Sequence, residues 1–164
     1  MSDLLIRNIR PMGGPATDLL IEGGRIVAIG PDLTAAEGFP VEDGRGCLAI
    51  PGLIDAHTHL DKTTWGMPWH VNDKNADLRG RIDFEREQRL VIGIDPVRQP
   101  LRHAALLAAH GATHVRSHVD IDTDHGLAIF PGLVEARDRL AGVIEIEIVP
   151  FRSPASSPAP ARSS

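Results

Sequence analysis

Residues 51–62 read PGLIDAHTHLDK, and their pattern is the starting point for predicting the fold. Its apolar run ends in two histidines, His57 and His59, which are separated by one residue. Alternate side chains of a strand share a face, so a strand from Leu53 to Leu60 places both imidazoles on the same side. Two such imidazoles can share a divalent metal ion. The alternative is a pair of solvent-facing histidines at the end of a strand.

Strand-like and helix-like segments alternate beyond this stretch. A polar loop and a charged helical segment come first, and Asp95-Pro96 then caps a helix that ends at Gly111. The further elements that we expect are a strand at 113–120, a helix from Pro131 to Gly142 and a strand at 143–149. This alternation is typical of parallel βα units.

The region before Pro51 has a different pattern. Short β-rich runs occupy residues 4–9, 19–21 and 25–29, and Gly23-Gly24 separates the last two. Two glycines can both take positive φ, which favours a two-residue hairpin turn. We therefore expect residues 1–50 to form a small antiparallel sheet.

The strand at 113–120 carries further polar residues on one face. His118 and Asp120 lie nearest its C-terminal end, where they would line a substrate pocket or support the metal ligands. The alternative is an internal ladder of ion pairs in which Arg116 neutralises Asp120 or a neighbouring acid. The spacing leaves both interpretations open.

Two further residue pairs are candidates for the site: two glutamates on one face of the third strand and two tryptophans in the polar loop. Glu145 and Glu147 could do acid and base chemistry, but both precede the end of their strand, which favours a structural role. Trp65 and Trp69 either form a wall over a flat substrate ring or cover the core. The other histidines, His70, His103, His110 and His125, are interpreted as surface or helix-end residues.

Composition limits the functional class. The 164 residues hold 22 acidic and 17 basic side chains, a formal charge of −5 without a basic cluster, so we expect no nucleic-acid or membrane partner. One cysteine, Cys47, excludes a disulfide framework and the zinc deaminases that use a Pro-Cys-x-x-Cys signature. Small molecules are the expected ligands. No signal peptide or membrane span is recognisable, so a cytoplasmic location is expected.

Three segments together resemble a known family. Residues 51–62, 114–120 and 144–149 are similar, in order, to the first three barrel strands of the amidohydrolase superfamily, in its cytosine-deaminase-like branch. The resemblance implies an α/β fold: a partial (βα)8 TIM-like barrel of about three units at 51–151, preceded at 1–50 by part of a small β-sandwich. It also implies His57 and His59 as ligands of zinc, iron or manganese.

The implied reaction is hydrolysis of a C–N bond, other than a peptide bond, in a heterocyclic amidine. In the family a metal-activated hydroxide attacks the ring. The catalytic glutamate, a further histidine and an aspartate come from later strands, which have no counterpart here. A hydantoinase-like or dihydroorotase-like cyclic amide hydrolase is an alternative within the same family.

A complete barrel takes roughly 250 residues, and the resemblance ends at Phe151. Residues 152–164 are rich in serine, proline and alanine and are expected to be a disordered tail outside the family pattern. We therefore expect a truncated, inactive fragment of an enzyme whose full-length form could be a homo-oligomer. A non-catalytic stump or an interaction fragment is the alternative.

Overall fold

The computed structural model describes residues 3–70, 80–81, 84–85, 91–121 and 127–152. The chain divides into two compact units, Met1–Pro51 and Gly52–Ser164, and each is described by itself. Within the described ranges, no helix is both long enough and apolar enough to cross a membrane.

The first unit is one β-sheet. Its strands are β1 (Leu4–Pro11), β2 (Thr17–Glu22), β3 (Arg25–Gly30), β4 (Val41–Asp43) and β5 (Leu48–Ala49). The sheet order is β3-β2-β1-β4, and β5 also pairs with β1. The predicted hairpin between β2 and β3 is confirmed, because Gly23 and Gly24 have φ of 57° and 77°.

The prediction of a purely antiparallel sheet is wrong for the last two strands. Both β4 and β5 run parallel to β1. They contain three and two residues, which is too short for an alternating pattern to be visible in the sequence. Both strands pair with β1 because the later chain folds back beside it. Local residue propensities do not determine such a long-range pairing.

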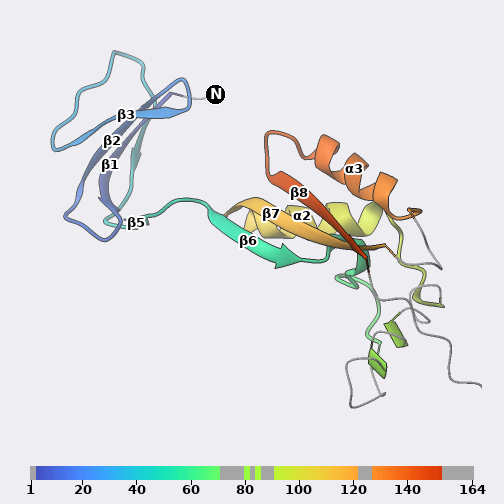
Figure 1. Cartoon of the computed structure of the whole chain (residues 1–164). Coiled ribbons are helices and arrows are strands. Elements are labelled where there is room, and N and C mark those ends of the chain that lie inside the picture. Colours follow the sequence, from blue (N-terminus) through green and yellow to red (C-terminus); the bar gives the residue numbers. More distant parts are fainter. Residues whose placement is uncertain (1–2, 71–79, 82–83, 86–90, 122–126, 153–164) are drawn as a thin grey trace, which may run out of the picture. The chain divides into compact units, whose positions relative to one another are not determined.

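The second unit alternates strands and helices, as predicted (Figure 1). It contains β6 (Leu53–Thr58), the 3-10 helix η1 (Leu60–Lys62), α2 (Arg98–Ala109), β7 (Ala112–Ile121), α3 (Phe130–Arg139) and β8 (Glu145–Arg152). The strands form a parallel sheet in the order β6-β7-β8. Most of the charged helical segment predicted near 77–89 lies outside the described residues, although 80–81 and 84–85 are helical. The predicted tail at 152–164 is wrong for its first residue, because Arg152 ends β8 and pairs with Ile121 of β7; the rest of it lies outside the described residues.

Local signals explain the limits of α2. The Oδ1 of Asp95 accepts hydrogen bonds from the backbone N–H groups of Val97 and Arg98, at 2.9 and 2.7 Å. These bonds satisfy donors that a helix start leaves without partners. At the other end, Gly111 has φ of 90°, which suits the residue after a helix. The predicted stop is confirmed, and Asp95 caps the turn that leads into α2, although the helix begins at Arg98 and not at Pro96.

Both helices pack on the same face of the parallel sheet. The core joins Val115 and Val119 of β7 to Ala104 of α2 and Leu133 of α3. Alternation along β7 then directs the even-numbered residues, from His114 to Asp120, to the opposite face. Ile54 on β6 is 69% exposed. No helix in the described part of the chain covers this second, open face.

Candidate metal centre

Three imidazole rings gather at the C-terminal ends of β6 and β7. The ring of His118 stacks on that of His57, with centroids 4.0 Å apart and planes at 17°. The ring of His59 lies 5.5 Å from His57 and 6.2 Å from His118. Phe151, near the end of β8, stands 6.1 and 6.2 Å from the rings of His59 and His118. Residues from all three strands therefore meet at one place.

An irregularity in β6 directs His57 to the open face. Asp55 pairs with Val115, but the next pair along is Thr58 with Ser117, so β6 has one residue more than β7 in this interval. Without the extra residue His57 would face the helices, as Ser117 does. A β-bulge of this kind redirects a side chain, and such bulges are common beside active sites.

His57 and His59 are spaced as two ligands of one ion would be. A metal–nitrogen distance of about 2.0–2.1 Å places the ring centroids of two tetrahedral imidazole ligands about 5 Å apart, close to the 5.5 Å observed. The Nδ1 of His59 is buried and has no hydrogen-bond partner among the described residues. The two histidines therefore fit a divalent ion.

His118 does not fit as a third ligand beside His57. Stacked rings 4.0 Å apart direct their nitrogens along two nearly parallel planes instead of toward a common point. Within the described ranges, no set of three or more His, Cys, Asp or Glu side chains could hold a metal ion. The described residues therefore offer two candidate ligands, whereas catalytic zinc sites take three from the protein.

The surroundings of His59 favour the neutral imidazole that metal binding needs. Its pKa is lowered chiefly because burial penalises the charged ring and also because the Lys62 cation lies nearby. The carboxylate of Asp120 acts in the opposite direction. Asp61 is fully buried, and its Oδ1 is 3.9 Å from the Nδ1 of His59.

Asp120 is paired with a lysine of η1. The Nζ of Lys62 donates to Oδ2 of Asp120 at 2.9 Å and lies 3.0 Å from Oε1 of Glu85. Arg116 instead binds Glu147 across the strands at 2.7 Å. The alternative of an ion-pair ladder thus holds for Arg116, but its partner is Glu147 and not Asp120.

The two glutamates of β8 occur in cross-strand pairs. Besides the Arg116–Glu147 pair, the Nε2 of His114 lies 3.0 Å from Oε2 of Glu145. Both pairs precede the C-terminal ends of their strands. This arrangement agrees with the structural role that the sequence favoured.

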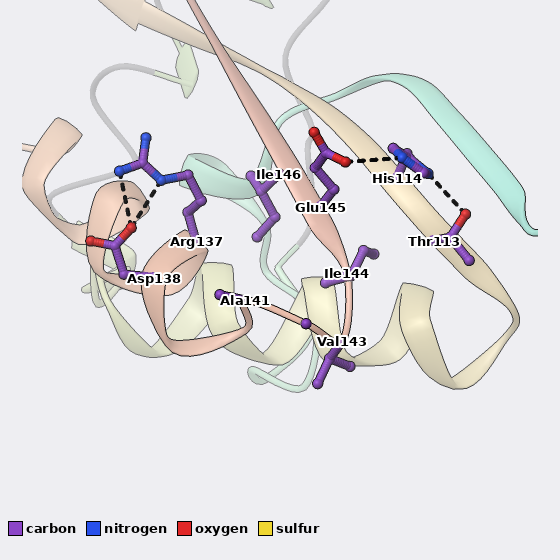
Figure 2. Close-up of a pocket in the computed structure, with 10 residues that line it drawn as sticks. Thr113, His114, Arg137, Asp138, Ala141, Val143, Ile144, Glu145 and Ile146 are labelled. Atoms are coloured by element: carbon purple, nitrogen blue, oxygen red, sulfur yellow. Dashed lines mark hydrogen bonds and ion pairs between the residues drawn. The ribbon is translucent and has the colours of Figure 1, made fainter. Parts of the chain in front are cut away.

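A hollow of about 510 Å³ lies at the opposite end of the sheet (Figure 2). Its lining includes His114, Glu145, Arg137 and Asp138, whose side chains pair with neighbours in the same hollow. In a βα barrel the C-terminal end carries the chemistry, and the other end contributes to stability. We therefore place the candidate site at the histidine cluster and not in this hollow.

The tryptophan loop lies against α2. Trp65 and Trp69 are exposed and line a hollow together with His103 and Leu106 of that helix. The buried side chain of Gln99 fixes this loop, because its Nε2 donates to the carbonyl oxygens of Thr63 and Trp65, both at 3.1 Å. Among the ring contacts and hydrogen bonds of the described residues, none joins either tryptophan to the histidine cluster.

Sequence reasoning did not identify four residues that shape the site. Lys62, Ser117, Phe151 and Gln99 act through partners far away in the chain. Lys62 offered a weak signal, since a lysine directly after an apolar strand end needs a partner when it is buried. The other three have no local signature, because their roles depend on strand pairing.

Comparison with known proteins gives the family. No family model matches the chain. The crystal structure of N-isopropylammelide isopropylaminohydrolase from Burkholderia multivorans superposes with a TM-score of 0.83 and 46% identity over 92% of this chain. The 5-methylcytosine deaminase from Klebsiella pneumoniae gives a TM-score of 0.71 and 32% identity over 90%. Atrazine chlorohydrolase from Arthrobacter aurescens, solved with zinc, shares the fold at 23% identity over 90% and a TM-score of 0.65.

The chain matches only part of each relative. It spans 38% of the Burkholderia protein, 36% of the deaminase and 35% of the chlorohydrolase. It also spans 38% of the curated N-isopropylammelide isopropyl amidohydrolase from Pseudomonas sp. (strain ADP), to which it is 27% identical over 160 residues. The chain belongs to the amidohydrolase superfamily and corresponds to the N-terminal portion of its members.

Proposed function

We propose that this chain supplies the first part of the active site of a metal-dependent hydrolase that breaks a C–N bond of a small heterocycle. The observation that carries the proposal is the convergence of His57 and His59 at the C-terminal end of β6, with the Nδ1 of His59 buried there without a hydrogen-bond partner among the described residues. Functional groups of βα folds lie at this end of the strands.

The proposed cofactor is a divalent ion, zinc or iron, with manganese as a further candidate. His57 and His59 would hold it, since imidazole nitrogen suits these metals. When bound, such an ion supplies a nucleophile for hydrolysis near neutral pH by lowering the pKa of water. The chain's own contribution is to hold two neutral imidazoles at a fixed separation.

The proposed substrate is a flat heterocycle with an amidine-type C–N bond, as in cytosine-like or aminotriazine rings. The relatives named for N-isopropylammelide and 5-methylcytosine support this class. His118 would line the pocket, since its ring lies against His57 on the open face. The proposed place of Asp120 is beside the same pocket, with its carboxylate bound to Lys62.

The role of Trp65 and Trp69 as a wall of that pocket stays a prediction. Both present exposed rings, which would stack on a flat substrate. A substrate that reaches from the histidine cluster toward the tryptophan loop would contact them. Replacing either with alanine would then raise KM of the active enzyme more than it lowers kcat.

The two units suggest the architecture of the longer enzyme. We propose Met1–Pro51 as the N-terminal part of a small β-sandwich and β6 to β8 as the first three strands of a (βα)8 barrel. Parallel strand order and helices on one face support the barrel. The open face of this sheet would then face the barrel interior.

Zinc titration of the purified 164-residue chain tests the proposal. We expect one weakly bound ion per chain, because two imidazoles provide only part of a site. Binding should be lost in the double variant His57→Ala/His59→Ala and retained in the control His110→Ala, whose exposed ring bonds the carbonyl oxygen of Leu106 in its own helix. Equal zinc binding by the double variant and the original chain would contradict the proposed site.

A turnover assay separates the enzyme from the alternatives. Amine release from N-isopropylammelide and ammonia release from cytosine would be measured beside hydrolysis of dihydroorotate, which tests the cyclic-amide alternative. We expect no turnover by the 164-residue chain alone and metal-dependent turnover by a longer protein that contains it. A longer protein without activity on any of these rings would favour the non-catalytic alternative.

A further inference from the structure

The junction between β6 and η1 carries one ligand histidine and follows the other. Backbone pairing of β6 with β7 ends at the pair Thr58–Ser117. His59 comes directly after it, with φ of −127° and ψ of 88°, at the start of η1. The position of His59 therefore depends on side-chain contacts and not on the strand ladder.

Two such contacts tie η1 to β7 on either side of His118. The buried Oγ of Ser117 accepts a hydrogen bond from the backbone N–H of Leu60 at 3.1 Å. Three residues further along β7, Asp120 accepts from the Nζ of Lys62 at 2.9 Å. His118 lies between these two points of attachment.

The Lys62–Asp120 pair is shielded from solvent. Its side chains are 18% and 15% exposed, whereas those of the Arg116–Glu147 pair on the same face are 49% and 56% exposed. Exposed pairs contribute little to stability, while breaking a buried pair leaves an uncompensated charge. The two pairs thus offer a matched comparison four residues apart on β7.

Lys62 is poorly suited to bind substrate directly. Its ammonium group already contacts the carboxylates of Asp120 and Glu85, at 2.9 and 3.0 Å. A cation that is held between two carboxylates and mostly buried has little capacity left for a third partner. Its geometry suits the task of fixing η1.

We propose that Lys62 and Asp120 are a positioning pair that fixes the β6–η1 junction against β7 and so sets the separation of the His57 and His59 imidazoles. This inference rests on the proposed function, because it assigns the pair to the same metal site. Its consequence is that loss of the pair weakens metal binding even though neither residue is a ligand.

The test combines zinc affinity with histidine ring NMR of the 164-residue chain. We expect Lys62→Met and Asp120→Asn each to weaken zinc binding about tenfold, as loss of residues that orient metal ligands does. Lys62→Arg, which keeps the cation, should restore most of the affinity. The control Arg116→Met, which removes the exposed pair, should leave the affinity unchanged.

Ring nitrogen shifts of the metal-free protein distinguish positioning from general destabilisation. In Lys62→Met and Asp120→Asn we expect shifts at His57, His59 and His118 but not at His110. Thermal unfolding identifies a variant that fails to fold, and the near-isosteric Asp120→Asn then provides the result. Zinc affinity in both variants equal to that of the original chain would overturn the positioning role.

Failure of the proposed function is separately visible. If the original chain binds no zinc, the metal site is contradicted. The histidine ring nitrogen shifts alone then test the positioning role of Lys62 and Asp120. Unchanged shifts in both variants would overturn that role. If the original chain binds zinc and the variants bind it equally well, the metal site stands and the positioning role is wrong.

Discussion

Ser117 shows how one buried hydroxyl can support the site. It is fully buried, and its Oγ accepts the N–H of Leu60, which begins η1. Replacement by alanine leaves that N–H buried without this acceptor, at a cost of about 1–3 kcal/mol. Ser117→Ala should therefore lower the free energy of unfolding by this amount in urea denaturation.

The control for Ser117 lies on the same strand. The hydroxyl of Thr113 is exposed and contacts only the adjacent His114 ring, at 2.9 Å, among its recorded hydrogen bonds. Thr113→Ala should change the free energy of unfolding by less than about 0.5 kcal/mol. Equal losses in the two variants would show that burial of the Ser117 bond is unimportant.

His103 makes stability depend on pH. Burial of its ring on α2 lowers its pKa below the ordinary value of 6.5, and the nearby Asp55 carboxylate only partly opposes this. As pH falls through 6.5, His103 becomes protonated in the unfolded chain, whereas it stays neutral in the folded chain. The stability that the neutral His103 ring contributes is complete above pH 6.5 and is lost as pH falls toward the lowered pKa.

We therefore expect the chain to lose more stability between pH 7.5 and 5.5 than the variant His103→Gln, which has no titrating ring. Urea midpoints at the two pH values measure this difference. An exposed histidine variant, His110→Gln, should behave like the original chain. Identical pH dependence in the original chain and in His103→Gln would contradict the role of burial.

At the scale of elements, Gly132 controls how α3 meets the start of α2. A Cβ at this position would collide with the backbone carbonyl of Pro96. On an exposed helix, glycine to alanine gains up to about 1 kcal/mol. Here we expect Gly132→Ala to destabilise the chain by about 1–3 kcal/mol, because the helices must move apart. A stabilised variant in thermal unfolding would contradict this contact.

The elements were predictable where the signal was local. Apolar alternation predicted β7, the Asp95 cap and Gly111 predicted the limits of α2, and two glycines predicted the first hairpin. The parallel pairing of β4 and β5 was missed, since both strands are short and their partner lies more than thirty residues earlier. The bulge in β6 was also missed, because it is defined by the register with β7.

At the scale of the whole molecule, strand order determines which candidate residues meet. Three parallel strands place His57, His118 and Phe151 at one end and the Glu145 pair toward the other. The sequence predicted His57 and His59 as a pair on one strand from Leu53 to Leu60, but β6 ends at Thr58 and His59 follows it at the start of η1. It could not predict that His118 stacks on His57 or that Lys62 binds Asp120, because both contacts need the register of β6 with β7.

The central claim is that His57 and His59 together hold a divalent ion. X-ray absorption at the zinc edge of the zinc-loaded chain tests it most directly. We predict two imidazole nitrogens at about 2.0–2.1 Å, and loss of this imidazole signal in His57→Ala/His59→Ala. A spectrum without imidazole, or one that the double variant reproduces, would contradict the claim.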